Sequence, residues 1–482
     1  MSLKSKLEKV PGYNTAMRPW HYIQALGAAT RYNRPAKNLR VIAVTGTNGK
    51  TTTCFMIWKM LSDAGLKTGL LTTVAWGGVN GDEKDVILAK KSDGAKPLKL
   101  SQIDAGPLHQ QLEHMTTERV GTLNRRIKAI TNAGAEFLVL EVTSHALMQS
   151  RTLGIPVEMA VFTNLTHEHL DYHGTFAKYR AAKLKLFKKT DIGIVNHDDK
   201  NARYFEELYA PGDIITYGIQ QGDYRAVDIK LSAAGVEYSC GDMKIQTQIP
   251  GRFNVYNSLA AVAVGKRIGL TDAEVEHGIT SLTAVEGRMT RVREGQDFEV
   301  IVDYAHAPDA LEKVFESVGK NAGQSAMDDD SKKVAKSKKN PKEKVYRKIP
   351  SFTGRIISVH GGAGRRDPST REERGAILGR ESDVVIITED DSRDEDPALI
   401  AAAFVKGAKR AGKTVDKDLF VELDRRSAIK KALEMAKKGD LVLILGKGHE
   451  KTILRADGPH VFEDIKVAEE LLKEMKGAKN GA

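Results

Sequence analysis

The chain has 482 residues, of which 41% are hydrophobic and 28% are charged, and this length suggests two to four domains with substantial cores. Such a chain is not a peptide hormone or a disulfide-stapled miniprotein, and no apolar run approaches the roughly 18 residues of a membrane-spanning helix. The formal net charge of +11 could indicate a nucleic-acid partner, so its distribution matters. Cys54 and Cys240 are too few for a disulfide framework or a cysteine-bound metal cluster, and we find no secretory signal. We expect a cytoplasmic protein.

Short apolar strands alternate with helical stretches, which predicts an α/β fold with parallel sheets. We expect a short helical segment at 1–39, an ATP-binding domain at 40–286 and a second α/β domain at 287–482. Within the first segment, the amphipathic stretch 17–32 predicts one helix packed on the body. The predicted strands are 39–47, 137–143, 159–165, 298–305, 355–362, 383–390 and 440–448.

Most of the excess charge lies in one place. Residues 331–348 hold nine lysines or arginines and one glutamate, which gives +8. The stretch is almost free of apolar residues, so it cannot offset the entropy of ordering, and we interpret 319–350 as a flexible surface insertion. Contact with RNA or an anionic membrane is the alternative, but blocks of like charge are usually solvated. We expect no nucleic-acid partner.

A glycine-containing turn follows the strand at 39–47 and precedes a predicted helix at 51–65. Backbone N–H groups and the helix N-terminus converge there, which makes an anion site. Lys50 can reach phosphate oxygens, and the hydroxyl of Thr51 can bind Mg²⁺. A tight turn with a solvated lysine is the alternative; the flanking strand and helix favour ATP binding.

Carboxylates and histidines follow two of the predicted strands. Glu141 ends the strand at 137–143, where ligands bind in open parallel sheets. Its alternative role is an ion pair with a helix, since a buried carboxylate needs a partner. The stretch THEHLDYHG at 166–174 clusters histidines and acidic residues after a buried strand, although histidines at strand ends are often only hydrogen-bonded.

Taken in order, these motifs resemble the Mur ligase family. The central part contains TGTNGKTTT, LEVTSHAL and FTNLTHEHLDYHGTFAKYRAAKLKLF. The later motifs GRFNVYNSLAA, GRM, DYAHAPDAL, DDSRDEDP and GKGHE are similar to those of the members that add the third peptide residue. The resemblance runs from about Val41 to near the C-terminus, interrupted by the basic insertion and by residues 80–113.

The resemblance implies a central P-loop ATPase-like domain with a parallel sheet, followed by a Rossmann-like domain. It implies an ATP-driven ligase that joins a diamino acid to UDP-MurNAc-L-Ala-D-Glu through an acyl phosphate, for peptidoglycan synthesis. It also implies ATP, two Mg²⁺ sites and a carbamylated lysine at Lys183. The expected partners are small-molecule substrates, and the expected state is a monomer.

The resemblance also assigns roles to single residues. Those on the ATP side are Gly46, Thr47, Asn48, Gly49, Lys50, Thr51, Thr52, Asn254, Asn257 and Arg288, with Asp303 as a ribose or phosphate contact and His306 in the same loop. The implied metal ligands are Thr51, Glu141, His169 and Lys183, and the implied catalytic residues are Lys50, Lys183, His169 and Asp303. The muramoyl-dipeptide residues are Thr116, Thr117, Thr143, Gln149 and Arg151, and the amino-acid residues are Arg366, Asp391, Arg393, Gly446 and Glu450.

Three departures from the family pattern leave alternatives open. The diaminopimelate motif appears as Asp390-Asp391-Ser392-Arg393, and Arg393 favours diaminopimelate over lysine because a guanidinium can bind the second carboxylate. Glu118 replaces the usual proline after Thr117. The family's UDP-binding domain does not fit in the residues before the phosphate loop, so residues 1–39 and 80–113 contact the UDP group, or UDP binds weakly, or the substrate lacks it.

Other functions remain as alternatives. The first is a related ligase, such as a folylpolyglutamate synthase, a cyanophycin-synthetase-like enzyme or a pseudomurein peptide ligase. A nucleic-acid-binding ATPase is a second, but the basic stretch holds only Tyr346 for base stacking. A third, an inactive scaffold, does not explain the retained Lys50, Glu141, His169 and Lys183.

Overall fold

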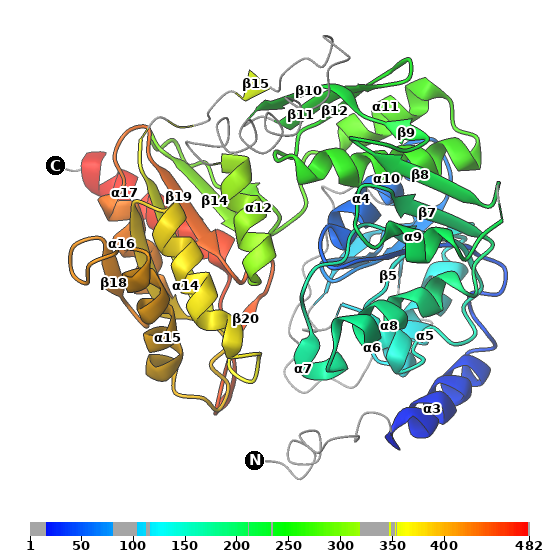
Figure 1. The fold of residues 1–482 in the computed structure, drawn as a ribbon, viewed down its shortest axis with the longest axis horizontal. Helices are drawn as coiled ribbons and strands as arrows, with labels where there is room; N and C mark the ends of the chain where they lie inside the picture. The colour runs from blue at the N-terminus through cyan, green and yellow to red at the C-terminus, as the bar shows by residue number, and fades with distance from the viewer. Residues whose placement is uncertain are drawn as a thin grey trace, which may run out of the picture.

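The computed structural model describes residues 16–80, 104–111, 116–210, 212–232, 235–318, 347–348, 352 and 354–480. Two α/β bodies lie side by side, as Figure 1 shows. We call residues 40–286 the central domain and residues 287–482 the C-terminal domain. The predicted fold class, a central ATPase-like domain followed by a second α/β domain, is confirmed.

A nine-stranded sheet forms the centre of the central domain, in the order β4-β3-β2-β5-β1-β6-β7-β8-β9. The pairs from β2 through β9 are parallel, and β3 and β4 add antiparallel strands at one edge. Its strands are β1 (Arg40–Thr45), β2 (Thr68–Leu71), β3 (Ala75–Gly77), β4 (Leu108–Gln110), β5 (Phe137–Glu141), β6 (Val157–Phe162), β7 (Ile192–Asn196), β8 (Ile214–Gly218) and β9 (Tyr224–Arg225).

Helices cover both faces of this sheet because its strands are apolar on both sides. Ile42 and Val44 of β1 pack into one core, and Val41 and Ala43 pack into the other. The first core is covered by α4 (Lys50–Asp63), α10 (Phe253–Ile268) and α11 (Asp272–Ser281), and the second by α5 (Val120–Asn132), α8 (Phe176–Phe187) and α9 (Ala202–Glu206). Two short helices, α6 (Ser144–Met148) and α7 (Leu170–His173), follow β5 and β6.

A second, four-stranded sheet of order β12-β11-β10-β15 packs on the first core. It contains β10 (Val227–Ser232), β11 (Gly235–Cys240), β12 (Met243–Thr247) and β15 (Arg347–Lys348). Strand β15 comes from the predicted basic insertion and pairs in parallel with β10, with Lys230 opposite Arg347. Of the predicted insertion at 319–350, residues 347 and 348 are described, and the others lie outside the described residues.

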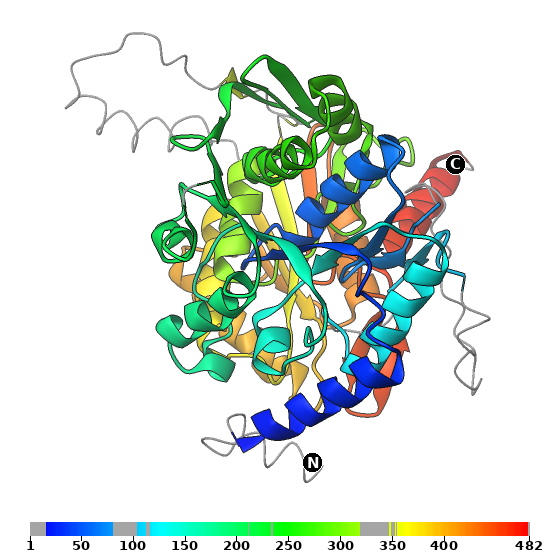
Figure 2. The same cartoon turned by 90° about the vertical axis from the view of Figure 1, so that its right-hand side faces the viewer.

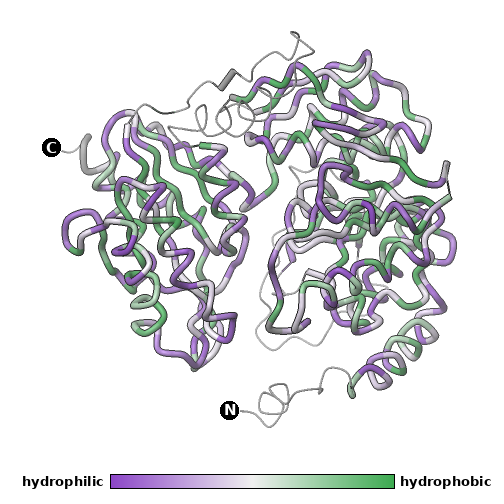
Figure 3. Tube along the Cα trace, viewed as in Figure 1, coloured by the Kyte–Doolittle hydropathy of each residue, from purple (hydrophilic) through white to green (hydrophobic). Residues whose placement is uncertain are grey.

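The C-terminal domain repeats the layered plan around a six-stranded sheet of order β13-β14-β19-β16-β17-β18. Figure 3 shows hydrophobic stretches along its central strands. Its strands are β13 (Thr290–Arg291), β14 (Glu299–Asp303), β16 (Ile356–Gly362), β17 (Val384–Glu389), β18 (Leu419–Val421) and β19 (Leu441–Leu445), with a separate hairpin of β20 (Thr452–Arg455) and β21 (Gly458–Val461). One face is covered by α12 (Pro308–Val318), α14 (Ser369–Glu381) and α15 (Pro397–Arg410), and the other by α16 (Arg425–Met435) and α17 (Asp464–Asn480).

The predicted strands are all present, with ends that differ from the prediction by at most three residues. The predicted N-terminal helix is α3 (Arg18–Arg31), which packs on α5 through Ala25 and Ala29. It lies at the outer edge of the central domain in Figures 1 and 2. Trp20 and Ile23 are exposed on it, and nothing among the described residues covers them. The described part of the chain holds no helix long and apolar enough to span a bilayer.

We predict that Gly407→Ala lowers the free energy of unfolding by about 1–2 kcal/mol. Helices α14 and α15 approach so closely that a Cβ on Gly407 would lie 1.9 Å from the carbonyl oxygen of Glu372. Gly121→Ala in α5 is the control, because its Cβ would meet open space and the change should stabilise by up to about 1 kcal/mol. Urea denaturation measures both; an unchanged Gly407→Ala variant would contradict this packing.

Candidate functional site

A pocket of about 660 Å³ lies between the two domains. Its walls come chiefly from residues at or beyond the ends of β1, β2, β5, β6, β14, β16 and β19, and from α10 and α12. Ligands of parallel α/β sheets bind beyond the carboxyl ends of the strands, and here two sheets contribute such ends to one pocket. It is therefore the candidate active site.

The phosphate loop forms one wall of this pocket, and its two glycines have conformations that favour glycine. Gly46 has a φ of +156° and Gly49 a φ of +82°. A Cβ on Gly46 would lie 1.9 Å from the hydroxyl oxygen of Thr163, so the loop needs glycine for packing as well. Lys50 is the first residue of α4 and donates to the carbonyl of Thr47 at 2.7 Å. Its ammonium group thus lies over the loop, where it can meet a phosphate oxygen.

Glu141 lies at the carboxyl end of β5, beside the start of α4. Its two carboxylate oxygens accept from the hydroxyl of Thr51 at 3.1 and 3.0 Å, and one also accepts from the backbone N–H and hydroxyl of Thr73, both at 3.0 Å. Glu141 is buried and forms no ion pair with the described residues. A buried carboxylate without a counter-cation beside a phosphate loop fits a divalent cation. Thr73 follows β2 and was not predicted as a site residue.

Asn254 and Asn257 lie on the first turns of α10 and line the pocket. The side-chain amide of Asn257 donates to Asn254 at 2.8 Å, and the amide of Asn254 donates to the Pro250 carbonyl at 2.7 Å. The carbonyl oxygen of the Asn257 side chain lies close to Gly49 of the phosphate loop. These contacts place both predicted asparagines next to the loop.

Residues 286–289, where the central domain passes into the C-terminal domain, are called the hinge. Arg288 and Asp303 connect this hinge to the same pocket. Arg288 donates to the Thr51 hydroxyl at 3.3 Å, and its guanidinium lies 4.5 Å from the centre of the Tyr304 ring. Asp303 accepts from the backbone N–H groups of Met289 and Ala305, each at 2.8 Å, and burial raises its pKa. Here Asp303 joins the end of β14 to the hinge.

Lys183 lies beneath the phosphate loop and does not line the pocket. It is buried, donates to the carbonyl of Gly46 at 2.6 Å and has its nitrogen 4.8 Å from the centre of the Tyr179 ring. Burial and the neighbouring Lys50 lower the pKa of Lys183 well below its usual value. Burial therefore shifts Lys183 toward the neutral amine, compared with an exposed helical lysine.

Glu168 brings the two domains' histidines together. Its carboxylate lies 3.7 Å from Nε2 of His169 in the central domain and 3.7 Å from Nε2 of His306 in the C-terminal domain. Burial alone would raise the pKa of Glu168, but His169, His306 and the nearby lysines lower it to about 2. Burial lowers the pKa of His169, which favours the neutral imidazole that can act as a metal ligand. Glu168 lay inside the predicted cluster, but no role was assigned to it.

Four of the five predicted muramoyl-dipeptide residues form one hydrogen-bonded group: Thr117, Thr143, Gln149 and Arg151. The hydroxyl of Thr117 donates to the Glu141 carbonyl and accepts from the backbone N–H of Thr143, both at 3.0 Å. Arg151 donates to the carbonyl of Thr117 and to the side chain of Gln149. These contacts join the group directly to the strand that carries Glu141.

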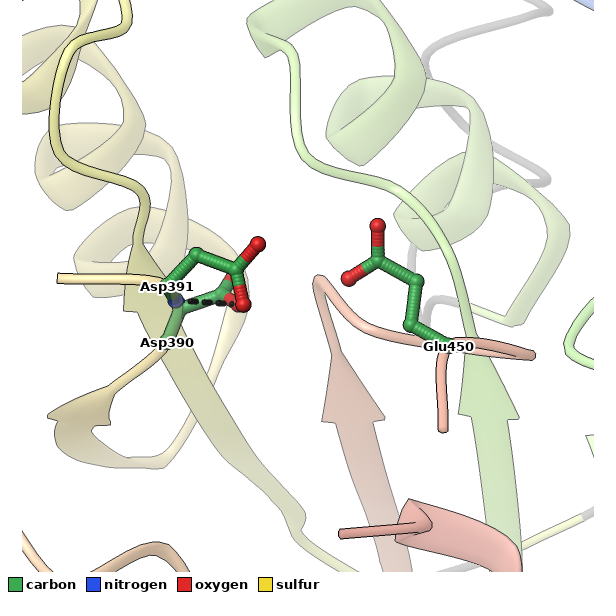
Figure 4. Close-up of side chains that lie close together, drawn as sticks. All are labelled: Asp390, Asp391 and Glu450. Carbon is green, nitrogen blue, oxygen red and sulfur yellow. Dashed lines mark hydrogen bonds between the residues drawn. The ribbon is translucent and has the colours of Figure 1, made fainter. Parts of the chain in front are cut away.

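Three acidic side chains meet in the C-terminal domain, on the side of the pocket formed by that domain: Asp390, Asp391 and Glu450. Figure 4 shows the two aspartates after β17 facing Glu450, which follows β19. Lys447, which is fully buried, donates to Asp390 at 3.2 Å, Asp391 at 3.0 Å and Glu450 at 2.9 Å. Carboxylates so arranged could hold a metal ion, but the ammonium of Lys447 already binds all three. Lys447 belongs to the GKGHE motif and was not predicted as a site residue.

Two arginines and a glycine complete this side. Arg393 has its guanidinium 3.9 Å from Asp391 and donates to the Gly364 carbonyl at 2.9 Å. Arg366 is exposed, lines the pocket and forms no ion pair with the described residues. Gly446 has a φ of +110°, and a Cβ there would lie 3.3 Å from Asp390.

A hydrogen bond joins the phosphate loop of the central domain to helix α12 of the C-terminal domain. The side-chain amide of Asn48 donates to Asp309 of α12 at 2.6 Å, and the hydroxyl of Thr166 donates to the same carboxylate oxygen at 3.2 Å. Lys313 pairs with Asp309 from within α12 at 2.8 Å. Asp309 thus holds the C-terminal domain against the loop.

The pocket brings most of the predicted residues together, but not all of them. Six of the predicted residues do not line it: Gly46, Gln149, Lys183, Asp391, Arg393 and Gly446. Residues 1–15, 81–103 and 112–113, in the regions expected to contact the UDP group, lie outside the described residues. Those that do line it are Thr47, Asn48, Gly49, Lys50, Thr51, Thr52, Thr116, Thr117, Glu141, Thr143, Arg151, His169, Asn254, Asn257, Arg288, Asp303, His306, Arg366 and Glu450.

Comparison with known proteins gives two family matches. Residues 44–265 match the Mur ligase middle domain, and residues 343–448 match the Mur ligase glutamate ligase domain. A curated relative from Syntrophomonas wolfei, UDP-N-acetylmuramoyl-L-alanyl-D-glutamate--2,6-diaminopimelate ligase, is 35% identical over 462 residues, which cover 93% of this chain and 81% of that protein.

Solved structures show the same likeness. A structure of UDP-N-acetylmuramoyl-L-alanyl-D-glutamate--2,6-diaminopimelate ligase is 27% identical with a TM-score of 0.55, over 97% of this chain and 84% of that one. The folylpolyglutamate synthase of Mycobacterium tuberculosis, complexed with ADP and AMPPCP, has a TM-score of 0.63 over 89% of this chain and 92% of that one. At 15% identity, this second likeness concerns the fold alone.

We predict that Gly49→Ala raises the dissociation constant for ATP at least about tenfold. The methyl group would lie 2.3 Å from Asn257, in a backbone conformation that alanine rarely adopts. Gly65→Ala is the control, since Gly65 ends the same helical segment with a φ of +80° but has open space around its Cβ. It should lose stability without losing ATP affinity. Calorimetric titration measures both, and equal affinities would contradict the assignment of the loop.

Proposed function

The chain belongs to the Mur ligase family of ATP-dependent ligases, and we propose that it joins meso-diaminopimelate to UDP-MurNAc-L-Ala-D-Glu. The observation that carries the proposal is the single pocket, lined by the phosphate loop, by the threonines beside Glu141 and by Arg366 and Glu450 of the other domain. Sites for ATP, for the muramoyl dipeptide and for the incoming amino acid can thus share one pocket. The name of the relative from Syntrophomonas wolfei supports the same substrates.

In the first step, the γ-carboxylate of D-glutamate attacks the γ-phosphorus of ATP. A carboxyl oxygen–phosphorus bond forms, the bond to the bridging oxygen breaks, and ADP leaves. Both reactants are anions, so positive groups must neutralise the charge that develops between them. Lys50 and the N-terminus of α4 provide this on the phosphate side, and Arg288 reaches the same place from the hinge.

In the second step, the amine of the acceptor attacks the acyl carbon. A carbon–nitrogen bond forms, the carbon–oxygen bond breaks so that inorganic phosphate leaves, and the nitrogen gives a proton to water. The attack requires the acceptor's amine close to the acyl phosphate, which would be held between the phosphate loop and Thr117. Glu450 and Arg366 line this part of the pocket from the C-terminal domain, so they would orient the acceptor.

The residues offer ligands for one Mg²⁺ as they stand, and for a second one if Lys183 is carbamylated. The hydroxyl of Thr51 and the carboxylate of Glu141 would hold the first, and His169 with a carbamylated Lys183 would hold the second. When bound, Mg²⁺ neutralises phosphate charge. An ammonium group has no lone pair to offer a metal, so Lys183 could serve only after carbamylation.

Carbamylation of Lys183 is supported by its buried surroundings. Attack on CO₂ requires an unprotonated amine, and burial lowers the pKa of this lysine. A nitrogen–carbon bond forms, a carbon–oxygen π bond opens, and the proton leaves nitrogen to water. The product is an anionic oxygen ligand beneath the loop that carries Gly46.

We call the part of the site around Asp390, Asp391 and Glu450, where the incoming amino acid would bind, the acceptor end. Its charges favour a diamino acid with a second carboxylate. Asp390, Asp391 and Glu450 carry three negative charges, and Lys447 neutralises one of them. The remaining negative charge suits a distant ammonium group, while Arg366 and Arg393 suit a distant carboxylate. Diaminopimelate carries both groups at its far end. Lysine lacks the carboxylate, so we propose it as the lesser substrate.

The site also carries the remaining expectations. We propose that the protein acts as a monomer, because one chain provides both walls of the pocket. We also propose a cytoplasmic location, which suits two cysteines that form no disulfide.

We predict phosphate release from ATP with UDP-MurNAc-L-Ala-D-Glu and meso-diaminopimelate, and at least about tenfold lower kcat/KM with lysine, since the loss of a bidentate ion pair costs more than about 1.4 kcal/mol. Arg393→Ala should reduce this preference chiefly through the KM for diaminopimelate. The measurement is a coupled phosphate assay with a panel of amino acids. Activity with folate and glutamate, or with none of the panel, would overturn the assignment.

We predict that Lys183→Ala is inactive and that a short carboxylic acid such as acetate partly restores its activity, because the acid can supply the missing anionic oxygen. Lys188→Ala is the control, since Lys188 ends the same helix but is exposed. It should retain wild-type activity and gain nothing from acetate. A Lys183→Ala variant that is fully active without acetate would contradict the carbamate.

A further inference from the structure

A fully buried arginine lies behind the acceptor end of the pocket. Arg425 is the first residue of α16, and its guanidinium forms two hydrogen bonds of 2.7 Å with the carboxylate of Asp464, the first residue of α17. Both side chains have no solvent exposure. No assigned role in ATP, donor or metal binding accounts for this pair.

The same guanidinium also binds two backbone carbonyls. Arg425 donates to the Glu389 carbonyl at 3.2 Å and to the Leu445 carbonyl at 3.1 Å. Glu389 is the last residue of β17, and Leu445 is the last residue of β19. These strands do not pair with each other, because β16 lies between them in the sheet. Arg425 therefore spans the end of β16 and fixes the separation of two strand ends.

Each of these carbonyls belongs to a residue that directly precedes a residue of the proposed amino-acid site. Asp390 and Asp391 follow Glu389, and Gly446 and Lys447 follow Leu445. The ammonium of Lys447 reaches from the second strand end to both aspartates of the first, at 3.2 and 3.0 Å. Those distances require the two strand ends to stay in register. Lys447 holds the side chains at the front, and Arg425 holds the backbone behind them.

Stability alone is a poor reason for the pair. Replacing a buried ion pair by apolar residues of similar size is often neutral or stabilising, because both charges lose their hydration. An apolar pair, however, could not donate to the carbonyls of Glu389 and Leu445. What the arginine uniquely supplies is the connection between the two strand ends.

We propose that Arg425 is a positioning residue for the acceptor amino acid: it sets the spacing between the two aspartates and Glu450. The proposal rests on the proposed function, since it assigns the acceptor to this end of the pocket. Loss of the two carbonyl bonds would let the strand ends drift, and a displacement of about 1 Å can reduce catalysis by up to about a hundredfold. The phosphate loop lies on the other domain and would not be affected.

The test compares two variants with a matched control. Arg425→Lys keeps the charge but cannot form all four bonds, and the double variant Arg425→Met with Asp464→Leu removes both charges together. The control is Arg355→Lys, because Arg355 pairs with Asp440 at the opposite, amino end of β16 and β19. Its loss disturbs the same sheet away from the pocket.

Steady-state kinetics with the phosphate assay gives KM for diaminopimelate and for ATP separately, and thermal denaturation shows whether each variant is folded. Both Arg425 variants should raise the KM for diaminopimelate about tenfold or more while the KM for ATP stays within about twofold. Arg355→Lys should change neither by more than about twofold. Formation of the acyl phosphate without amino acid, trapped as hydroxamate, should be the same in all variants.

Three results would overturn the proposal: an unchanged KM for diaminopimelate in the folded Arg425 variants, an equal rise in both KM values, or a double variant that does not fold. The last would show that the pair is needed for stability. These failures differ from failure of the proposed function, which would appear in the wild-type protein as phosphate release that does not depend on diaminopimelate.

Discussion

The structure depends on one constraint, which is that two parallel sheets direct the carboxyl ends of their strands at the same pocket. Several side chains that line the pocket lie at or just beyond the end of a strand: Glu141 ends β5, Glu168 follows β6, and Glu450 follows β19. Because the strands are apolar on both faces and covered by helices, their ends are the only places in the sheets where polar side chains can gather cheaply.

The two domains solve the resulting electrostatic problem differently. In the C-terminal domain, buried carboxylates find internal cations, so Lys447 binds three of them and Arg425 binds Asp464. In the central domain, Glu141 is buried and has no ion pair among the residues that the structure describes, and burial favours the neutral form of Lys183. The first arrangement is complete in itself and can orient a substrate. The second leaves charge to be supplied from outside, as expected for ATP and its metal ions.

The sequence predicts the parts of this site that depend on local patterns. Strands, the phosphate loop and Glu141 follow from apolar runs and from residues adjacent to them, and the structure places them as expected. Thr73, Lys447 and Arg425 could not be found in this way, because their roles come from contacts with residues 68, 57 and 39 positions away. Lys447 lies within a recognised motif, yet only its burial among three carboxylates shows what it does.

The contact of Asp309 with Asn48 couples the position of the C-terminal domain to the occupation of the phosphate loop. The Asp309 carboxylate accepts from Asn48 on the phosphate loop, so it lies where the phosphates of a nucleotide would bring further negative charge. Although Lys313 pairs with Asp309, further negative charge beside this carboxylate weakens its bond to Asn48, and with it the contact that joins the domains. By thermodynamic linkage, the orientation of the C-terminal domain and the affinity for nucleotide must change together. The placement of an acceptor site carried by that domain and the occupation of the loop are therefore coupled rather than independent.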